Sequence, residues 1–524
     1  MPKFTPATAA LLALVACART PDAELAQPNP ALGGEALSTQ QLDEQIWEKV
    51  KATNAPFDWN QAAEHVVWSA LQRSDQVLSV GYAPADKCSP QAALPPRAVT
   101  DAAYQQAREQ VLRLILSSEQ QADPTLTLEQ LVVFGEETLP VLNVRVRQLS
   151  TVQRLRRSPL VRYAEPMGYD PYRPRTSTAA QRSLSSSGCG SNAATPNLVA
   201  GSDYTVLSNG SKSSWNQADV YHGVRSAWSQ STGSGIKLVV IDTGASDAQE
   251  NLGSAFNQGL SSGRTIERLV TLPRASIFGI PTGPVETPND QCGHGTSMAG
   301  AAAAPRGTDG ASVGIAYNAN LISIRAAADV FLDESREVKG VSDAFTLAAN
   351  RPDVRIISMS MGRVTSSSQM ADAIRYAHSR GKLIFCAAGT SFDWSAGWVG
   401  VIFPANMAEA VAVTGIKDNL TSRCDECHVG SDVEFTVVMQ RSSNNLRPLS
   451  LAMSGDAPST VGGSSVSTAS MAGMAAVVWS KYPTETREQI QQRLVAASSN
   501  ATNRNPSFGY GRVNLAKAVG ALVQ

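Results

Sequence analysis

The stretch Ile236–Gly244, with the sequence Ile-Lys-Leu-Val-Val-Ile-Asp-Thr-Gly, decides the fold of the second half of the chain. A nearly continuous run of aliphatic residues is typical of a strand buried on both faces, as in a parallel sheet covered by helices. The strand ends in Asp242, which places a carboxylate at the carboxyl edge of the sheet, where open α/β folds hold their sites. An Asp after a strand is also a common cap, so this motif alone assigns no function.

A sequence pattern consistent with such a sheet extends from Trp215 to the C-terminus. Apolar strands punctuated by glycine alternate there with Ala-rich helical stretches. This alternation predicts an α/β fold, a mostly parallel sheet flanked by helices.

Two further stretches of this region bring reactive side chains to the ends of helices. Cys292–Ala304 (CGHGTSMAGAAAA) places His294 between two glycines, at the start of a helix of small residues that must pack tightly. Gly462–Trp479 opens with Gly-Gly-Ser-Ser, so that Ser465 lies at the N-terminus of a second such helix. Free backbone N–H groups and the helix dipole favour an anion there. Each residue also has a structural interpretation, the His as a satisfied core residue and the Ser as an ordinary N-cap.

Taken together, Asp242, His294 and Ser465 resemble, in residue type and chain order, the subtilisin-like serine peptidases (subtilases). The resemblance covers roughly residues 215–524, and Asp-Thr-Gly and Gly-His-Gly-Thr match the family pattern outright. It implies the subtilisin-like α/β fold and a triad in which Ser465 attacks a peptide carbonyl, His294 moves the proton and Asp242 orients His294.

The serine motif departs from the family. The usual Gly-Thr-Ser-Met-Ala-Ser-Pro is replaced by Gly463-Ser-Ser-Val-Ser-Thr-Ala469. Aligning Met471-Ala-Gly with the family's Val-Ala-Gly puts the nucleophile at Ser465, and not at Ser464 or Ser467.

A second departure concerns the oxyanion hole. In the family, an Ala-Ala-Gly-Asn turn supplies an amide donor to the oxyanion; here Ala387-Ala-Gly-Thr390 puts a hydroxyl at the Asn position. The resemblance implies that Thr390 partly fills this role beside the backbone N–H of Ser465, giving an active but slower peptidase. It also implies that Ser360, Met361 and Gly362 pair with the substrate backbone by strand addition. A plain core strand is the alternative for these three residues.

The first half of the chain predicts separate units. Residues 39–73 show apolar side chains at roughly helical spacing, which predicts an N-terminal helical region over residues 39–97, and residues 98–168 predict a small α+β domain. The end of this domain, Leu160–Pro166, resembles that of the family's inhibitory propeptide, which implies a self-inhibited precursor with its own propeptide as a partner. Residues 169–214 are rich in Ser and Gly and predict a cleavable linker before the peptidase domain, residues 215–524.

The N-terminus predicts export. Residues 1–16 form a short apolar segment typical of a signal peptide. Leu14-Val-Ala-Cys17 resembles the lipobox of bacterial lipoproteins, which implies a lipid on Cys17 and a membrane anchor through the tether 17–38. An ordinary secretory signal is the alternative. We therefore expect an anchored protein of the bacterial cell envelope, or a secreted one.

Export also permits disulfides. The six cysteines other than Cys17 can pair in fifteen ways, and Cys424–Cys427 is the favoured local pair. The sequence Cys424–His428 also fits a c-type haem attachment or a zinc site, but no second axial ligand and no fourth zinc ligand are evident. Calcium is common in the family, but no loop has a countable ligand pattern. The triad chemistry requires no metal or other cofactor.

Net charge and composition restrict the classes of binding partner to be expected. A net charge of −1 gives no support for binding nucleic acid, so protein or peptide substrates are expected. Acidic residues at 329, 333, 334 and 337 either favour basic substrate side chains or form a solvated loop. The leading hypothesis is an exported serine endopeptidase; the alternative is a lipid-anchored pseudoprotease with a binding or regulatory role. An ester hydrolase is disfavoured because Ser465 is not in a Gly-x-Ser-x-Gly turn.

Overall fold

The computed structural model describes residues 34–88, 98–171, 189, 192–277, 280–390 and 399–521. The predicted signal peptide, the lipobox with Cys17, most of the tether and residues 172–188 of the predicted linker lie outside these residues. Within the described part of the chain, no helix is both long and apolar enough to cross a membrane.

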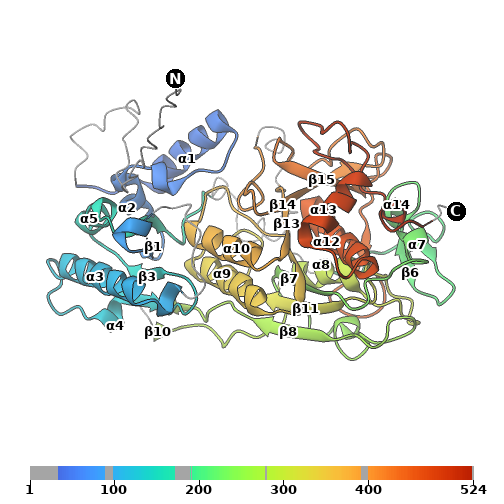
Figure 1. Cartoon of the computed structure of the whole chain (residues 1–524), viewed down its shortest axis with the longest axis horizontal. Coiled ribbons are helices and arrows are strands. Elements are labelled where there is room, and N and C mark those ends of the chain that lie inside the picture. Colours follow the sequence, from blue (N-terminus) through green and yellow to red (C-terminus); the bar gives the residue numbers. More distant parts are fainter. Residues whose placement is uncertain are drawn as a thin grey trace, which may run out of the picture.

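A seven-stranded parallel sheet forms the centre of the C-terminal domain, as the sequence predicted (Figure 1). Its strand order is β15-β14-β13-β12-β7-β11-β8, and every neighbouring pair is parallel. The order turns back between β12 and β7, which brings the carboxyl ends of distant segments together. The strands are β7 (Lys237–Asp242), β8 (Ile266–Val270), β11 (Asn320–Arg325), β12 (Val354–Met359), β13 (Leu383–Ala387), β14 (Val411–Lys417) and β15 (Val433–Gln440).

Helices cover both faces of this sheet and enclose two apolar cores. One face carries α8 (His294–Ala303), α12 (Gly463–Lys481) and α13 (Arg487–Ala496), and the other carries α9 (Ser335–Asn350) and α10 (Ser368–Ser379). The small residues of α8 and α12 have a packing cause, because a Cβ on Gly473 would lie 2.9 Å from the carbonyl oxygen of Ala302. Two one-turn helices, α7 (Val224–Ala227) and α14 (Leu515–Ala518), complete the first face.

The N-terminal unit is a four-stranded antiparallel sheet, in the order β2-β3-β1-β4, covered by helices. Its elements are α1 (Thr39–Thr53), α2 (Glu64–Gln72), β1 (Val77–Tyr82), α3 (Ala102–Glu119), α4 (Leu128–Leu131), β2 (Val132–Phe134), β3 (Val141–Arg145), α5 (Leu149–Arg157) and β4 (Val161–Pro166).

The predicted division between residues 39–97 and 98–168 is wrong. Strand β1 comes from the first segment, yet it lies between β3 and β4 of the second. The two segments also share one apolar core. All six residues of β1 are buried, so the strand lacks the alternation of polar and apolar residues that marks a half-exposed strand.

This N-terminal unit packs on α9 and α10 of the C-terminal domain (Figure 1). The buried guanidinium of Arg162 donates to both carboxylate oxygens of Asp372, at 2.7 and 3.0 Å. The carboxylate of Glu165 accepts from the backbone N–H and the hydroxyl of Ser368, at the start of α10. A buried ion pair and buried hydrogen bonds therefore join the two units.

The linker prediction also needs correction for residues 192–214. They include the hairpin of β5 (Tyr204–Val206) and β6 (Lys212–Ser214) and lie on the C-terminal domain. The N–H of Thr195 donates to Pro458 O at 2.9 Å, and that of Lys212 to Ala311 O at 2.9 Å. Backbone hydrogen bonds to distant segments order this stretch, and such bonds leave no hydrophobic period in the sequence.

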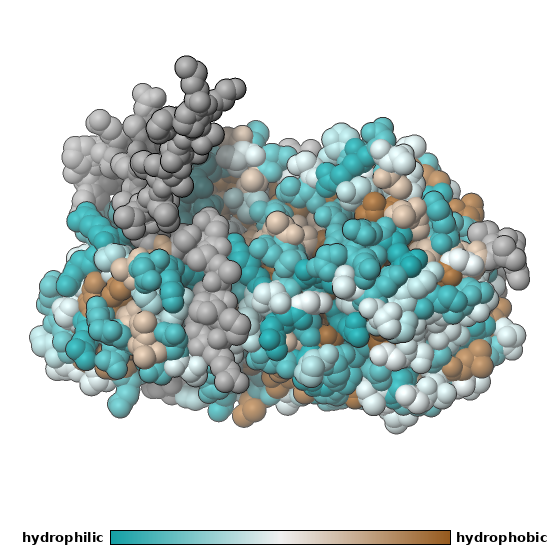
Figure 2. All heavy atoms as spheres, viewed as in Figure 1, coloured by the Kyte–Doolittle hydropathy of each residue, from teal (hydrophilic) through white to brown (hydrophobic). Residues whose placement is uncertain are grey.

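The remaining elements are short. They are η2 (Trp59–Gln61), η3 (Ala85–Lys87), η4 (Ala98–Thr100), η5 (Trp215–Gln217), η6 (Glu250–Leu252), β9 (Ser276–Ile277), β10 (Ile280–Pro281), β16 (Leu449–Ser450) and β17 (Ser459–Thr460). On the face shown in Figure 2, hydrophilic residues predominate and apolar ones are scattered.

Candidate active site

Two of the predicted catalytic residues meet at the carboxyl edge of the sheet. Asp242 is the last residue of β7, and His294 is the first residue of α8. The Oδ1 atom of Asp242 lies 2.7 Å from His294 Nδ1 and also accepts the N–H of Thr243 at 2.8 Å. Both side chains are buried. Because a carboxylate only accepts, Nδ1 of the imidazole carries the proton and the tautomer is fixed.

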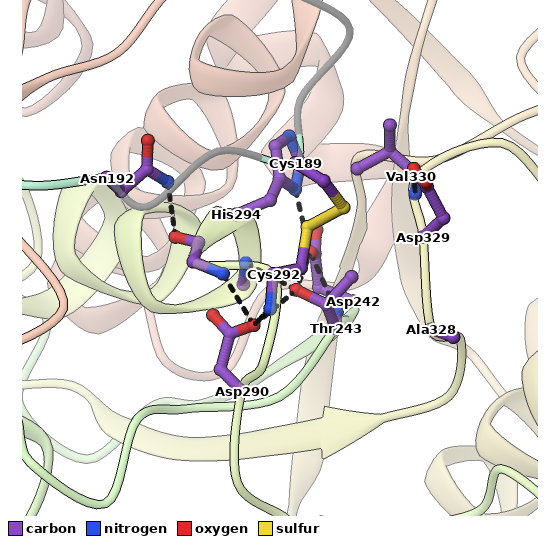
Figure 3. Close-up of a disulfide and its surroundings, with 12 residues drawn as sticks. Cys189, Asn192, Asp242, Thr243, Asp290, Cys292, His294, Ala328, Asp329 and Val330 are labelled. Atoms are coloured by element: carbon purple, nitrogen blue, oxygen red, sulfur yellow. Dashed lines mark hydrogen bonds and ion pairs between the residues drawn. A yellow bond between two sulfur atoms is a disulfide. The ribbon is translucent and has the colours of Figure 1, made fainter. Parts of the chain in front are cut away.

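Sequence reasoning missed Asp290, whose hydrogen bonds join the Asp-Thr-Gly motif of Asp242 to the Gly-His-Gly-Thr motif of His294 (Figure 3). One carboxylate oxygen accepts the N–H groups of Cys292 and Gly293 at 2.9 and 2.8 Å, and the other accepts from the N–H and hydroxyl of Thr296. The hydroxyl of Thr243 donates to Asp290 at 2.9 Å and accepts the N–H of Gly295 at 2.9 Å. The one available signal was an Asp in the turn just before a helix, a typical capping position.

The carboxylates control the charge of His294. Burial alone would lower the pKa of its imidazole, but the charge and hydrogen bond of Asp242 outweigh burial, and Asp290 and Asp329 add to the effect. The pKa of His294 is therefore raised above its ordinary value. A base of raised pKa accepts a proton more readily, as a general base must.

Ser465 lies at the N-terminus of α12, next to the end of β12. Its hydroxyl donates to Ser360 O at 3.3 Å, and the hydroxyl of Ser360 donates back to Ser465 O at 3.0 Å. Among the described residues, Ser465 makes no hydrogen bond to His294. Catalytic hydrogen bonds of this kind are often long without substrate and tighten in the complex.

The neighbouring serines differ from Ser465 in accessibility. Ser464 and Ser467 are buried, whereas Ser465 is partly exposed. The hydroxyl of Ser467 donates to Gly463 O at 3.3 Å, and that of Ser464 is enclosed by the Gly389–Thr390 turn. Of the three, only Ser465 presents a hydroxyl that a substrate can reach.

Thr390 follows β13 and contacts the start of α12. Its Oγ1 accepts the backbone N–H of Ser464 at 3.1 Å and lies 2.9 Å from Ser464 Oγ. Gly389, with φ of +126°, makes the turn that brings the hydroxyl there. Thr390, which is expected to take part in the oxyanion hole, thus contacts Ser464, the residue just before the expected nucleophile Ser465.

The predicted substrate-binding segment is partly occupied by the protein itself. Met361 is buried. The N–H of Gly362 donates to Val330 O at 3.3 Å, and its carbonyl accepts the N–H of Leu332 at 3.4 Å. A peptide that pairs with Gly362 must displace this contact.

The acidic loop is only partly solvated. Glu337 is buried, and its carboxylate accepts the N–H groups of Ala328 and Asp329 at 3.0 and 3.2 Å. Burial, with Glu334 and Asp333 nearby, raises its pKa to about 8. For Glu337, both alternatives are wrong, because its carboxylate holds the loop from inside.

Two disulfides lie near these residues. The predicted pair Cys424–Cys427 is confirmed, and its sulfurs are bonded to each other and so are not available to haem or zinc. A second bond, Cys189–Cys292, was not predicted; it lies two residues before His294 (Figure 3). Beside it, the amide of Asn192 donates to Gly293 O at 2.5 Å. The described residues contain no group of three or more His, Cys, Asp or Glu side chains placed to hold a metal ion.

Comparison with curated proteins gives relatives of moderate identity. Alkaline elastase YaB of Bacillus sp. (strain YaB) is 29% identical over 286 residues, which are 54% of this chain and 64% of that protein. Subtilisin DY of Bacillus licheniformis is 28% identical over 53% of this chain and 88% of that protein. The chain therefore spans less than two thirds of the length of the first of these relatives.

Among solved structures, MycP1 from Mycobacterium smegmatis is similar at 21% identity, with a TM-score of 0.45, over 62% of this chain and 88% of that one. The family model of the subtilases, Peptidase_S8, matches residues 233–512, which include Asp242, His294, Thr390 and Ser465. The chain belongs to the subtilase family of serine-type peptidases.

Proposed function

We propose that this protein is an exported serine endopeptidase that hydrolyses peptide bonds through an acyl-enzyme. The observation that carries the proposal is the buried Asp242–His294 hydrogen bond of 2.7 Å, at the same sheet edge as the accessible hydroxyl of Ser465. Membership of the subtilase family supports the reaction class.

Each residue has a role that follows from its contacts. Ser465 attacks the peptide carbonyl while His294 Nε2 takes its proton, and the same proton passes to the leaving amine. Asp242 keeps the proton on Nδ1 and stabilises the imidazolium that forms. Water then repeats the sequence on the acyl-enzyme. The proposed chemistry needs no metal or organic cofactor.

The oxyanion is expected to form at the start of α12. The N–H of Ser465 belongs to the first turn of the helix, whose N–H groups have no intrahelical acceptor. The hydroxyl of Thr390 is the second proposed donor. Loss of one such donor typically lowers turnover by about 10²–10³-fold, so an imperfect replacement of the amide leaves an enzyme that is slow but active.

The N-terminal unit is proposed to act as an inhibitory propeptide and the linker as the place of cleavage. Its buried contacts with α10, through Arg162 and Glu165, support tight association. A lipid on Cys17 would anchor the precursor to a membrane, and an envelope or secreted location follows from the signal peptide.

Labelling by a fluorophosphonate, together with casein cleavage, tests the reaction. Wild type should be labelled, Ser465→Ala and His294→Ala should not, and Ser229→Ala, at an exposed serine elsewhere, should behave as wild type. Absence of labelling in all of them would favour a pseudoprotease. The pairing of Gly362 with Val330 and Leu332 is the observation that supports this second candidate.

Self-processing has its own test. Wild type should give a shorter fragment, whereas Ser465→Ala should keep the 55.3 kDa chain, less its signal peptide. Retention of the same intact chain by both would contradict the precursor proposal.

The pH dependence follows from His294. The imidazole must be neutral to accept the proton of Ser465, and its pKa is raised, so kcat/KM should increase with pH through a pKa above about 6.5. For stability the sign is opposite: the Asp242–His294 interaction contributes fully below the unfolded pKa and is lost as pH rises through the folded one. A pH profile of kcat/KM in which activity falls over that range would argue against His294 as the base.

A further inference from the structure

Two separate segments converge on the Gly389–Thr390 turn. The start of α12 contributes Ser464, whose hydroxyl oxygen accepts the N–H of Gly389 at 3.2 Å. The loop of the Cys424–Cys427 disulfide contributes a bridge between Cys427 and Thr390. The next residue, His428, donates its N–H to Gly389 O at 3.0 Å. The turn is thus held on two sides by groups outside the Asp-His-Ser set.

The hydroxyls of Thr390 and Ser464 are limited in how they can donate and accept hydrogen bonds. Oγ1 of Thr390 already accepts the N–H of Ser464 at 3.1 Å, and Oγ of Ser464 already accepts the N–H of Gly389. The hydroxyls lie 2.9 Å apart, so one of them donates to the other. Each hydroxyl has one proton and two lone pairs. The pair therefore always keeps one proton that is not used inside it.

We propose that Ser464 is a positioning residue that fixes Thr390 as a hydrogen-bond donor to the oxyanion. When the hydroxyl of Ser464 donates to Thr390, both lone pairs of Thr390 Oγ1 are occupied, by the N–H and the O–H of the same serine. Thr390 can then only donate. A single rotatable hydroxyl would otherwise spend part of its time accepting, whereas an amide NH₂ has no such choice. This inference rests on the proposed peptidase function.

The loop Cys424–His428 also holds the Gly389–Thr390 turn. The imidazole of His428 lies against Gly389, where an added Cβ would be 2.4 Å from its Nδ1 atom. Nδ1 lies 3.0 Å from Gly400 O, so it carries the proton. Burial lowers the pKa of His428 to about 4, which keeps the ring uncharged beside the turn. The Cys-x-x-Cys-His motif thus acts on catalysis through Thr390, by holding the same turn that Ser464 contacts.

The test compares Thr390→Val, Ser464→Ala and the double variant. Thr390→Val loses the donor, so kcat should fall by up to about 10²–10³-fold with little change in KM. Ser464→Ala loses the hydrogen bond that fixes the donor, so kcat should fall by about three- to tenfold, the range that one hydrogen bond contributes. In the Thr390→Val background the Ser464→Ala change should have no further effect, because there is no donor left to fix.

Three measurements separate this role from a structural one. Ser464→Thr keeps the hydroxyl and should restore kcat. Ser467→Ala removes a buried hydroxyl one turn further along the same helix and should leave kcat unchanged. Cys424→Ala/Cys427→Ala and, should that variant not fold, His428→Asn should lower kcat in wild type and not in Thr390→Val. Asp425→Asn, in the same loop but bonded to Lys417 and Gln440, is the matched loop control.

The outcomes are distinct from those of the proposed function. Wild type that fails to react with a fluorophosphonate would overturn the peptidase proposal itself. Wild type that reacts, with Ser464→Ala equal to Ser467→Ala or with additive losses in the double variant, would overturn the positioning role. A larger loss for Ser464→Ala than for Thr390→Val would also overturn it, since Ser464 would then be the direct donor.

Discussion

Two helix N-termini of the peptidase domain, those of α10 and α12, differ in the group that accepts from their free N–H groups. The start of α10 is closed by the carboxyl group of Glu165, which comes from the N-terminal unit and accepts from both the N–H and the hydroxyl of Ser368. The start of α12 has glycine as its N-cap and no side-chain cap; among the described residues, the hydroxyl of Thr390 is the side-chain acceptor there, from the N–H of Ser464. One end already holds a carboxyl group from another unit, and the other does not.

The difference teaches how one local feature serves two purposes. Free N–H groups and the positive end of the dipole attract negative charge at every helix start. At α10, a buried carboxyl group uses the free N–H groups for a docking contact between two units. Neutral hydroxyls leave the attraction unsatisfied, so that it is available to charge that develops only in a transition state.

The largest effect is expected when α12 is made like α10. Thr390→Asp places a carboxylate at the open end, while Thr390→Asn places an uncharged amide of the same shape there. We expect the Asp variant to have kcat at least about 10³-fold below the Asn variant, because a donor is lost and the developing oxyanion is repelled.

The stability of the same pair should change in the other direction. A carboxylate near a helix N-terminus stabilises by about 0.3–1 kcal/mol, so urea unfolding should find Thr390→Asp no less stable than Thr390→Asn. Equal kcat values for the two variants would mean that no negative charge develops at this end of α12.

A second large effect concerns the closed end. Among the described residues, Arg162→Met leaves the buried carboxylate of Asp372 with Tyr163, at 3.0 Å, and the more distant Arg375. Removing one partner of a buried pair costs about 3–5 kcal/mol, and the remaining partners place the expected loss near 3 kcal/mol. Urea unfolding in a Ser465→Ala background measures it without self-cleavage.

Arg113→Met is the matched control, because its ion pair with Glu109 is exposed and worth about 0–1 kcal/mol. A loss for Arg162→Met as small as for this control would show that the interface does not depend on its buried charges.

Docking of the N-terminal unit at the start of α10 should also depend on pH. Burial raises the pKa of Glu165 to about 8, with Asp58 adding to the effect and the bonds from Ser368 and the charge of Arg363 opposing it. A carboxyl of raised pKa favours the docked state when protonated. Its contribution is therefore present below about pH 4.5 and is lost as pH rises through about 8.

Glu165→Gln should flatten this dependence, measured by hydrogen exchange of the N-terminal unit against pH in the Ser465→Ala chain. Some slope should remain, because burial also raises the pKa of Asp170, and that of Asp333 to about 6. An unchanged slope in Glu165→Gln would assign the pH dependence to other groups.

The smallest effect sets the baseline for an ordinary helix start. Ser38 caps α1 through a capping box with Gln41. Ser38→Ala should cost about 1 kcal/mol in urea unfolding, with no change in kcat and no change in the pH dependence. A change in kcat with this variant would mean that general stability, and not the chemistry of the helix end, governs activity.

Much of the peptidase domain followed from the sequence, because its strands are long aliphatic runs and its reactive residues stand in short motifs. Asp242 and His294 could be placed together for this reason, and the departure at Thr390 was visible as a single residue. The partners of Thr390 could not be predicted, since Ser464 and Cys427 are distant in sequence and contact the turn only through the fold.

Other features left weaker signals. Strand β1 was hidden because burial on both faces removes the alternation by which a half-exposed strand is found. Asp290 acts through backbone N–H groups, and such contacts leave no pattern of residue types. The pairing of Gly362 with Val330 and Leu332 is a backbone contact between separate segments and is likewise absent from the sequence pattern.

The Cys189–Cys292 bond divides the predicted cleavage region, about 168–214, into two windows that electrophoresis can tell apart. A cut before Cys189 separates the N-terminal unit from the rest of the chain even without a reducing agent. A cut between Cys189 and residue 214 leaves the two fragments joined by sulfur, so that they migrate as one chain until the sample is reduced. In the first case the excised unit is free to diffuse away, and in the second it stays tethered two residues from His294. The two gels, run side by side, therefore show whether processing makes a free enzyme or one that keeps its own inhibitor at hand.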